Sequence, residues 1–143
     1  MTKDAVVYVD TSVLVKQYLR EADSERAVAL LERATIATST ISELELVSTL
    51  YAAHRARVLS YNQLHVLLKQ LEKDCAAWYR LDVTTEVIDR ARDVISKELV
   101  RALDAIHCAS ALLLQETRSG PIPFATSDQR QRAAAMSLGF TCL

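Results

Sequence analysis

Hydrophobic and polar residues are arranged along this chain in two patterns, which predict two kinds of element. Short apolar runs, typical of strands buried within a sheet, occupy residues 5–10, 35–39, 80–84 and 122–127. In longer segments apolar residues recur every three or four positions, as on one face of a helix: 11–19, 22–34, 41–59, 60–79, 85–99, 99–115 and 129–139. Strands that alternate with helices predict an α/β fold with a mainly parallel sheet, and residues 140–143 are a candidate further strand.

Several helix ends carry recognisable capping residues. Asp23 and Ser24 are good N-cap residues for the helix of residues 22–34, and Ser60 with Gln63 matches a capping box. Gly139 is expected to end the last helix. The side of helix 41–59 that faces the core is expected to carry Leu46, Val47, Leu50 and Tyr51.

Length and composition indicate one globular domain, which we expect to span residues 1–143. Half of the residues are hydrophobic and 24% are charged, as in ordinary soluble proteins. We expect no membrane association, because no apolar run approaches the roughly 18 residues of a membrane span. Asp4 and Asp10 bracket an apolar run that is too short for a signal peptide, so a cytoplasmic protein is expected.

The rarer residue types argue against several kinds of site. Cys75, Cys108 and Cys142 form no CxxC pair and no disulfide framework. The three histidines lack zinc-ligand spacing, and two glycines cannot supply a P-loop or a dinucleotide-binding GxGxxG. The net charge of −1 provides no global field for nucleic acid, although arginine, the better phosphate ligand, outnumbers lysine by twelve to five.

Asp10 and Asp128 occupy the same local context, since each ends a predicted strand and directly precedes a predicted helix. The carboxyl ends of parallel strands lie along one edge of a sheet, where ligands bind. We therefore expect these two aspartates to be neighbours in space. Taken singly, each is also explained as a helix N-cap.

Asp104 raises a separate question, because it is the only acidic residue of segment 99–115 and a buried carboxylate without a partner is costly. If its helix begins near residue 102, at the same sheet edge, the helix dipole stabilises an anion in the first turn. A salt bridge with Arg101, three residues earlier, is the competing explanation.

The segment STISELE, residues 39–45, offers a fourth acid. Glu45 follows Ser42 by three positions, and Glu43 follows Thr40 by three, so each pair fits a capping box. Capping a helix and belonging to a site are compatible, because both place the carboxylate at a helix N-terminus.

Three or four converging carboxylates repel one another unless protons or a cation neutralise them. Oxygen ligands without His or Cys suit Mg²⁺ or Mn²⁺ rather than Zn²⁺. A carboxylate-held Mg²⁺ beside a water can hydrolyse phosphodiester bonds, because the ion lowers the pKa of the water and offsets charge in the transition state. We hypothesise that such a cation compensates Asp104.

Four stretches carry these acids in order along the chain. VVYVDTSVLVKQYL contains Asp10, SELELVSTLYAAHR contains Glu45, LDAIHCASALL contains Asp104, and FATSDQRQRAAAMSLGF contains Asp128. Together they resemble the motifs of the PIN-domain nucleases, and in particular of the VapC toxins of bacterial toxin–antitoxin pairs. The resemblance spans nearly the whole chain; Cys108 is a slight departure, because the family more often has leucine there.

The resemblance implies a three-layer α/β/α fold and a Mg²⁺- or Mn²⁺-dependent endoribonuclease, the toxin of a type II toxin–antitoxin system. It also implies a homodimer that a cognate VapB-type antitoxin inhibits. Asp10 and Asp104 would be the principal metal ligands, and Asp128 would act through a water or a second ion. Glu45 would hold the metal or its water, and it is preferred to Glu43 because it directly precedes LVSTL, as the family's glutamate does.

Further residues are expected to support this site. Thr11, Ser12 and Thr126 would orient the acids through hydrogen bonds. His107 is expected to pack or to form an ordinary hydrogen bond, not to act as a general base. Candidates for holding the RNA backbone, with a solvated helix face as the alternative for each, are Arg101, Arg130 and Arg132.

Two other functions are compatible with parts of the pattern. A phosphatase with Asp10 as nucleophile is one, but the haloacid-dehalogenase pattern needs a second aspartate where this chain has Ser12. A PIN-fold binding module that has lost catalysis is the other, and it would be favoured if the protein bound neither Mg²⁺ nor Mn²⁺.

Overall fold

A parallel sheet forms the centre of the computed structural model, which describes residues 5–118 and 120–143; Asp4 lies outside these ranges. Its strands are β1 (Val6–Val9), β2 (Thr35–Ser39), β3 (Tyr79–Leu81) and β4 (Phe124–Ala125). They are ordered β3-β2-β1-β4, and each neighbouring pair is parallel. The predicted α/β class with a parallel sheet is confirmed.

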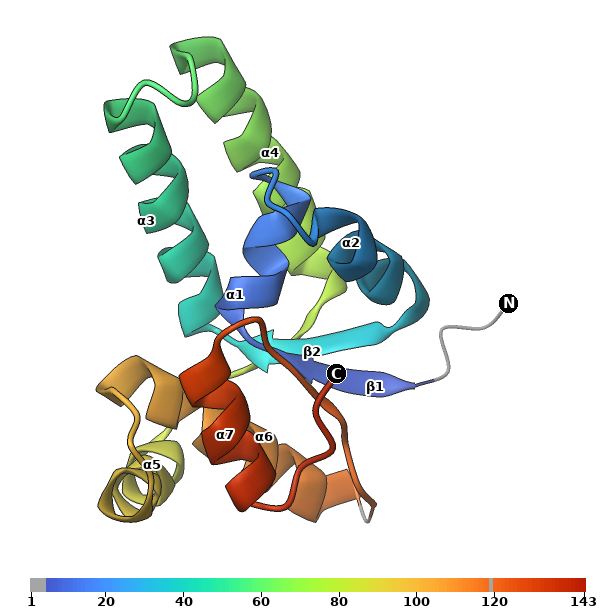
Figure 1. The fold of residues 1–143 in the computed structure, drawn as a ribbon, viewed down its shortest axis with the longest axis vertical. Coiled ribbons are helices and arrows are strands. Elements are labelled where there is room, and N and C mark those ends of the chain that lie inside the picture. Colours follow the sequence, from blue (N-terminus) through green and yellow to red (C-terminus); the bar gives the residue numbers. More distant parts are fainter. Residues whose placement is uncertain (1–4, 119) are drawn as a thin grey trace.

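Helices cover both faces of the sheet in three layers (Figure 1). They are α1 (Thr11–Leu14), continued by a 3-10 turn η1 (Val15–Gln17), α2 (Ser24–Arg33), α3 (Ile41–Arg55), α4 (Tyr61–Ala77), α5 (Thr85–Lys97), α6 (Ala102–Arg118) and α7 (Gln129–Ser137). Helices α1 to α4 lie on one face and α5 to α7 on the other (Figure 1). This is the expected α/β/α arrangement.

Strand β1 divides the hydrophobic core into two parts, because successive side chains of a strand point to opposite faces. Val7 and Val9 belong to the cluster that includes Leu46 and Leu50 of α3. Tyr8 belongs to the second cluster, with residues of α5, α6 and α7. Burial on both faces explains why β1 is an unbroken apolar run in the sequence.

Most expected helix ends lie close to their structural positions. Ser60 and Gln63 form the predicted capping box of α4, with both reciprocal hydrogen bonds present. Asp23 occupies the N-cap position of α2, but its carboxylate binds Lys16 instead of capping the helix. Tyr51 was expected to face the core, and this is wrong, since 40% of its surface is exposed.

Two segments differ more from the sequence patterns. Residues 11–19 form a four-residue helix and a 3-10 turn instead of one continuous helix. The candidate strand at residues 140–143 is reduced to one parallel bridge between Cys142 and Phe124. No helix in the described residues combines the length and hydrophobicity that a membrane span needs.

Candidate acidic site at the carboxyl edge of the sheet

Asp10 stands at the junction between β1 and α1 and is almost completely buried, with 4% of its surface exposed. Its Oδ1 accepts hydrogen bonds from the Ser12 main-chain N–H at 3.1 Å and from Ser12 Oγ at 2.6 Å. The sequence folds this way because Asp10 caps α1 immediately after the strand. Burial raises the pKa of Asp10 even though these donors favour its ionised form.

Ser12 connects Asp10 to the end of β4, the strand that pairs with β1. Its Oγ accepts from the Ser127 N–H at 2.8 Å and lies 3.3 Å from Thr126 Oγ1. Thr126 Oγ1 in turn accepts from the Asp128 N–H at 3.1 Å. The structure therefore places Asp10 and Asp128 at the ends of one short hydrogen-bonded chain.

Asp128 caps α7 as Asp10 caps α1. Its Oδ1 accepts from the main-chain N–H of Arg130 at 2.8 Å and of Gln131 at 3.1 Å. The positive ends of α1, α6 and α7 thus lie near carboxylates, an arrangement that helix dipoles favour. Helix capping and membership of an acidic site coexist in these two aspartates.

Glu45 and Glu43 have different partners in the structure. Glu45 Oε1 accepts from Thr11 Oγ1 at 2.7 Å and lies 2.8 Å from His107 Nε2. Glu43 forms a salt bridge with Arg80 at 3.0 Å, where both side chains are well exposed. Desolvation raises the pKa of Glu45, but the contacts with His107 and Thr11 bring it below the ordinary value.

The buried side chain of His107 connects Tyr8 of the sheet to Glu45. Only 2% of its surface is exposed, its Nδ1 lies 2.8 Å from Tyr8 Oη, and its Nε2 faces Glu45. The expected ordinary hydrogen bond is present, but its partner was missed in the sequence. The sequence held one indication that His107 lies near the acids, because His107 follows Asp104 by three positions and therefore shares a face of α6 with Asp104.

Asp104 lies in the first turn of α6, which begins at Ala102, as expected. Arg101 Nε stands 4.0 Å from Asp104 Oδ2, and the arginine side chain is 81% exposed, so this ion pair is weak. Desolvation and then the nearby charge of Asp128 raise the pKa of Asp104. The competing explanation by Arg101 alone therefore leaves Asp104 only partly compensated.

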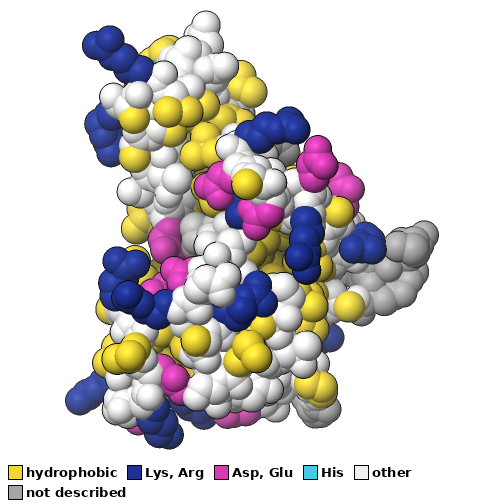
Figure 2. Space-filling view, viewed as in Figure 1, with side chains coloured by type: hydrophobic (Ala, Val, Ile, Leu, Met, Phe, Trp, Pro, Cys, Tyr) yellow, Lys and Arg dark blue, Asp and Glu magenta, His cyan; other side chains and the backbone are white. Residues whose placement is uncertain are grey.

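Three of the four acids lie within the electrostatic reach of His107, and the fourth, Asp128, acts on one of them. A charge on His107 lowers the pKa of Asp10, of Glu45 and of Asp104, and Asp128 acts on Asp104. Figure 2 shows acidic side chains gathered between the two helix layers, with Lys and Arg side chains beside them. The structure therefore brings residues from four distant segments to one edge of the sheet.

Comparison with known proteins places this geometry in a family. The family model described as PIN domain matches residues 7–136. The chain belongs to the PIN domain family. A comparison with curated proteins found no significant match.

Solved structures share the PIN fold with this chain. FitAcB from Neisseria gonorrhoeae has a TM-score of 0.70 at 20% identity, covering 96% of both chains. A toxin–antitoxin complex from Klebsiella pneumoniae has a TM-score of 0.64 at 17% identity, covering 89% of this chain and 90% of that one. Mycobacterium tuberculosis VapC20, described as a sarcin-ricin loop cleaving toxin, has a TM-score of 0.67 at 17% identity, covering 94% and 96%. At these identities the likeness shows the fold.

The donor set of this PIN domain suits a hard cation. Asp10, Glu45, Asp104 and Asp128 present oxygen atoms only, as Mg²⁺ and Mn²⁺ require. Within residues 5–118 and 120–143 no group of three or more His, Cys, Asp or Glu side chains is placed to hold an ion by itself. Mg²⁺ keeps several waters and binds through one or two carboxylates, so it does not need three side-chain ligands, and a cation would offset the charge of Asp128 near Asp104.

The three candidate arginines of the PIN domain differ in whether their side chains are exposed or bound within the protein. Arg101 and Arg130 are exposed beside Asp104 and Asp128. Arg132 donates to the main-chain oxygens of Thr126 at 2.9 Å and Leu143 at 3.0 Å. The structure therefore gives Arg132 a part in holding the C-terminal segment against β4.

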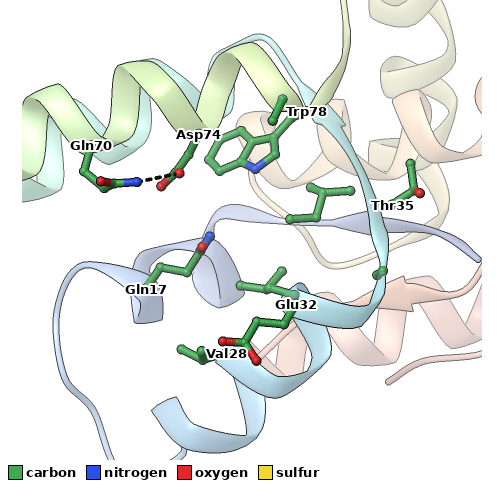
Figure 3. Close-up of a pocket in the computed structure, with 11 residues that line it drawn as sticks. Gln17, Val28, Glu32, Thr35, Gln70, Asp74 and Trp78 are labelled. Carbon is green, nitrogen blue, oxygen red and sulfur yellow. Dashed lines mark hydrogen bonds between the residues drawn. The ribbon is translucent and has the colours of Figure 1, made fainter. Parts of the chain in front are cut away.

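A separate cavity of about 490 Å³ lies at the amino edge of the sheet, between α2, α4 and β2. Figure 3 shows Gln17, Asp74 and Trp78 in its wall, with Gln70 Nε2 donating to Asp74 at 2.9 Å. None of the four acids lines this cavity. The acidic site is therefore distinct from it.

Proposed function

We propose that this PIN domain is a Mg²⁺- or Mn²⁺-dependent endoribonuclease. The observation that carries the proposal is the meeting of Asp10, Glu45, Asp104 and Asp128 at the carboxyl edge of the parallel sheet. Such an edge is where ligands bind in α/β sheets. When bound, the cation would supply an activated water and offset charge on the phosphoryl group.

The chain's own residues divide the work of holding this site. Asp10 and Asp104 are proposed as the principal ligands, with Asp128 acting through a water. Ser12 orients Asp10 through its short hydrogen bond, and Thr126 continues this network towards Asp128. Such fixed carboxylates lose little freedom when an ion arrives.

Glu45 is proposed to hold the metal or its water. Thr11 and His107 both contact Oε1 of Glu45 and fix the orientation of its carboxylate, and within residues 5–118 and 120–143 no hydrogen bond engages Oε2. Because hydrogen bonds keep the pKa of Glu45 below its usual value, it is ionised at neutral pH. Arg101 and Arg130, which are both exposed, are proposed to hold the phosphates of a bound RNA strand.

We further propose that the protein is the toxin of a type II toxin–antitoxin pair, acting in the cytoplasm as a homodimer. Its structural neighbours support this, since they include a toxin–antitoxin complex and a sarcin-ricin loop cleaving toxin. A VapB-type antitoxin is the proposed partner. The substrate is proposed to be single-stranded RNA, and the domain to span residues 1–143.

The test is cleavage of a labelled single-stranded RNA by the purified protein with Mg²⁺, with Mn²⁺ and with a chelator. We expect cleavage with either ion and none with the chelator. Asp104→Asn should abolish it, while Glu43→Gln, at the neighbouring salt bridge, should leave it unchanged. Wild-type cleavage by Asp104→Asn with Mg²⁺ present would contradict the assignment.

Two measurements separate the proposed nuclease from the alternatives: calorimetry tests a silent binding module, and phospho-enzyme trapping tests a phosphatase. A catalytically silent PIN module would show no heat of Mg²⁺ or Mn²⁺ binding, whereas the proposed nuclease binds the ion and loses that binding in Asp104→Asn. A phosphatase with Asp10 as nucleophile would form a phospho-enzyme. We expect none to be trapped, because the chain has Ser12 where that chemistry needs a second aspartate.

A further inference from the structure

We propose that the tip of the α3–α4 hairpin, residues 51–69, binds single-stranded RNA by stacking a base and contacting its phosphates. The hairpin projects from the body of the protein in Figure 1. That the nucleic acid is the substrate rests on the proposed nuclease function. The binding surface itself rests on charge, ring contacts and backbone geometry.

The hairpin tip has an unusual charge composition. No Asp or Glu occurs between Glu45 and Glu72, although the chain has 18 acidic residues in total. Arg55, Arg57 and Lys69 are exposed within this interval, and within the described residues none of their side chains forms an ion pair. In a protein of net charge −1, this is a local cationic surface that suits a polyanion.

Aromatic rings lie on the same surface. Tyr61 is 65% exposed, and its ring centroid lies 4.1 Å from that of His65, at an interplanar angle of 33°. The His54 ring packs edge-on against Tyr61 at 6.4 Å. Both histidine Nδ1 atoms are bound to main-chain oxygens, which fixes the rings in place. Exposed, pre-ordered rings on a segment that also carries exposed cationic side chains are the kind of platform on which unpaired bases stack.

Arg57 has a backbone conformation that glycine would adopt more easily. Its φ of 62° is in the left-handed region, and it follows α3 in a Schellman motif. The bonds of this motif run from Arg57 N to His54 O and from Val58 N to Ala53 O. The chain thus has a cationic side chain where the backbone favours glycine, which points to a use for its charge.

The tip and the acidic site are joined by one rigid helix. Glu45 lies near the start of α3 and Arg55 at its end, about 15 Å away at the rise of an α-helix. We therefore expect an RNA strand bound at the tip to extend along α3 towards the carboxylates. The exposed Val58 and Val66 would also suit a protein partner, but the arginines and the acid-free surface favour a polyanion.

The test measures binding of a short fluorescent single-stranded RNA to uncleaving Asp104→Asn protein, as a function of salt. In this background Arg57→Gly should weaken binding about fivefold or more and lower the slope of affinity against salt by about 1. The variant should remain folded, because glycine suits the backbone at this position. Arg92→Ala, which removes an exposed arginine of α5, is the matched control and should bind as the background does.

A second pair of variants tests the ring. Tyr61→Ala should weaken binding about fivefold or more, whereas Tyr61→Phe keeps the ring and should bind as the background does. Unchanged affinity in both Arg57→Gly and Tyr61→Ala would overturn the proposal. Loss of self-association in these variants with unchanged RNA affinity would also overturn it, and would make the tip a protein interface.

The outcomes separate this inference from the proposed function. If wild-type protein cuts RNA and the tip variants bind and cut normally, the tip proposal fails and the nuclease stands. If wild-type protein cuts no RNA but the tip variants lose affinity, the surface is correct and the nuclease assignment fails.

Discussion

His107 Nε2 lies 2.8 Å from Glu45 Oε1, although 62 positions separate these residues in the chain. The contact joins α6 to α3 beyond the carboxyl ends of the strands. The other ring nitrogen of His107 is held by Tyr8, in the middle of β1. The orientation of Glu45 is thus set by the core of the protein and not by the surface of its own helix.

The two neighbouring glutamates should behave differently. Glu45→Gln is expected to lower RNA cleavage at least about tenfold, the lower range for losing a group that orients a metal site. Glu43→Gln removes only an exposed salt bridge with Arg80 and should cut at the wild-type rate. Initial rates at saturating Mg²⁺ measure the difference, and equal loss in both variants would contradict the assignment of Glu45.

His107→Ala is expected to destabilise the fold by about 1–3 kcal/mol, because it removes a hydrogen-bond partner from the buried Tyr8 hydroxyl and one of the two partners of Glu45 Oε1. The pKa of Glu45 should also rise, since desolvation is then opposed only by Thr11. Chemical denaturation and NMR titration of the glutamate carboxyl groups measure the two effects. His65→Ala, at an exposed histidine, is the control for the denaturation measurement.

Asp104→Asn should stabilise the fold at neutral pH, in addition to abolishing cleavage. Desolvation and the charge of Asp128 raise the pKa of Asp104, so its ionised form weakens the folded state. The gain should be about 1.4 kcal/mol for each unit by which the pKa is raised.

The sign of this effect follows from linkage. The penalty is fully present above the raised folded-state pKa and falls away as the pH drops towards about 3.9, the ordinary value for aspartate. The difference in free energy of unfolding between Asp104→Asn and wild type should therefore shrink as the pH falls. Denaturation in a chelator across this range is the measurement, and a gain independent of pH would contradict the explanation.

Ser12→Ala is expected to destabilise the protein by about 1–3 kcal/mol and to lower cleavage, because three contacts of one hydroxyl are lost. The pKa of Asp10 should rise further, since burial then acts with one fewer donor against it. Ser127→Ala is the matched control, because Ser127 contributes its main-chain N–H to this network. Equal effects of both substitutions would argue against the role of Ser12.

Asp10 and Asp128 are an example of a spatial relationship that can be predicted from the sequence alone. We expect these two aspartates to meet, because each follows an apolar strand and parallel strands end at one edge of the sheet. The pairing of β1 with β4 places both aspartates at that edge. Asp104 required one further assumption, that its helix begins near residue 102, and α6 does begin at Ala102. The periodicity of a strand or helix is a local property, so it can be read without tertiary structure.

The choice between Glu43 and Glu45 could not be made from that periodicity, because both fit a capping box. The docking of α6 gives the two glutamates different partners, by placing His107 against Glu45 while Arg80 of β3 pairs with Glu43, and this supports the proposal of Glu45. Arg132 is a second example, since its binding to Thr126 and Leu143 depends on where the C-terminal segment packs. Contacts of this kind join segments far apart in the chain.

The sequence by itself determined the order of strands and helices, the parallel sheet and the edge at which Asp10 and Asp128 meet. Only the tertiary structure decided that a buried histidine contacts Glu45 while Glu43 pairs with Arg80, and that the hairpin of α3 and α4 projects from the body of the protein (Figure 1). The reason is physical: hydrophobic patterning sets which face of each element is buried, whereas side-chain hydrogen bonds depend on the relative position of elements after packing.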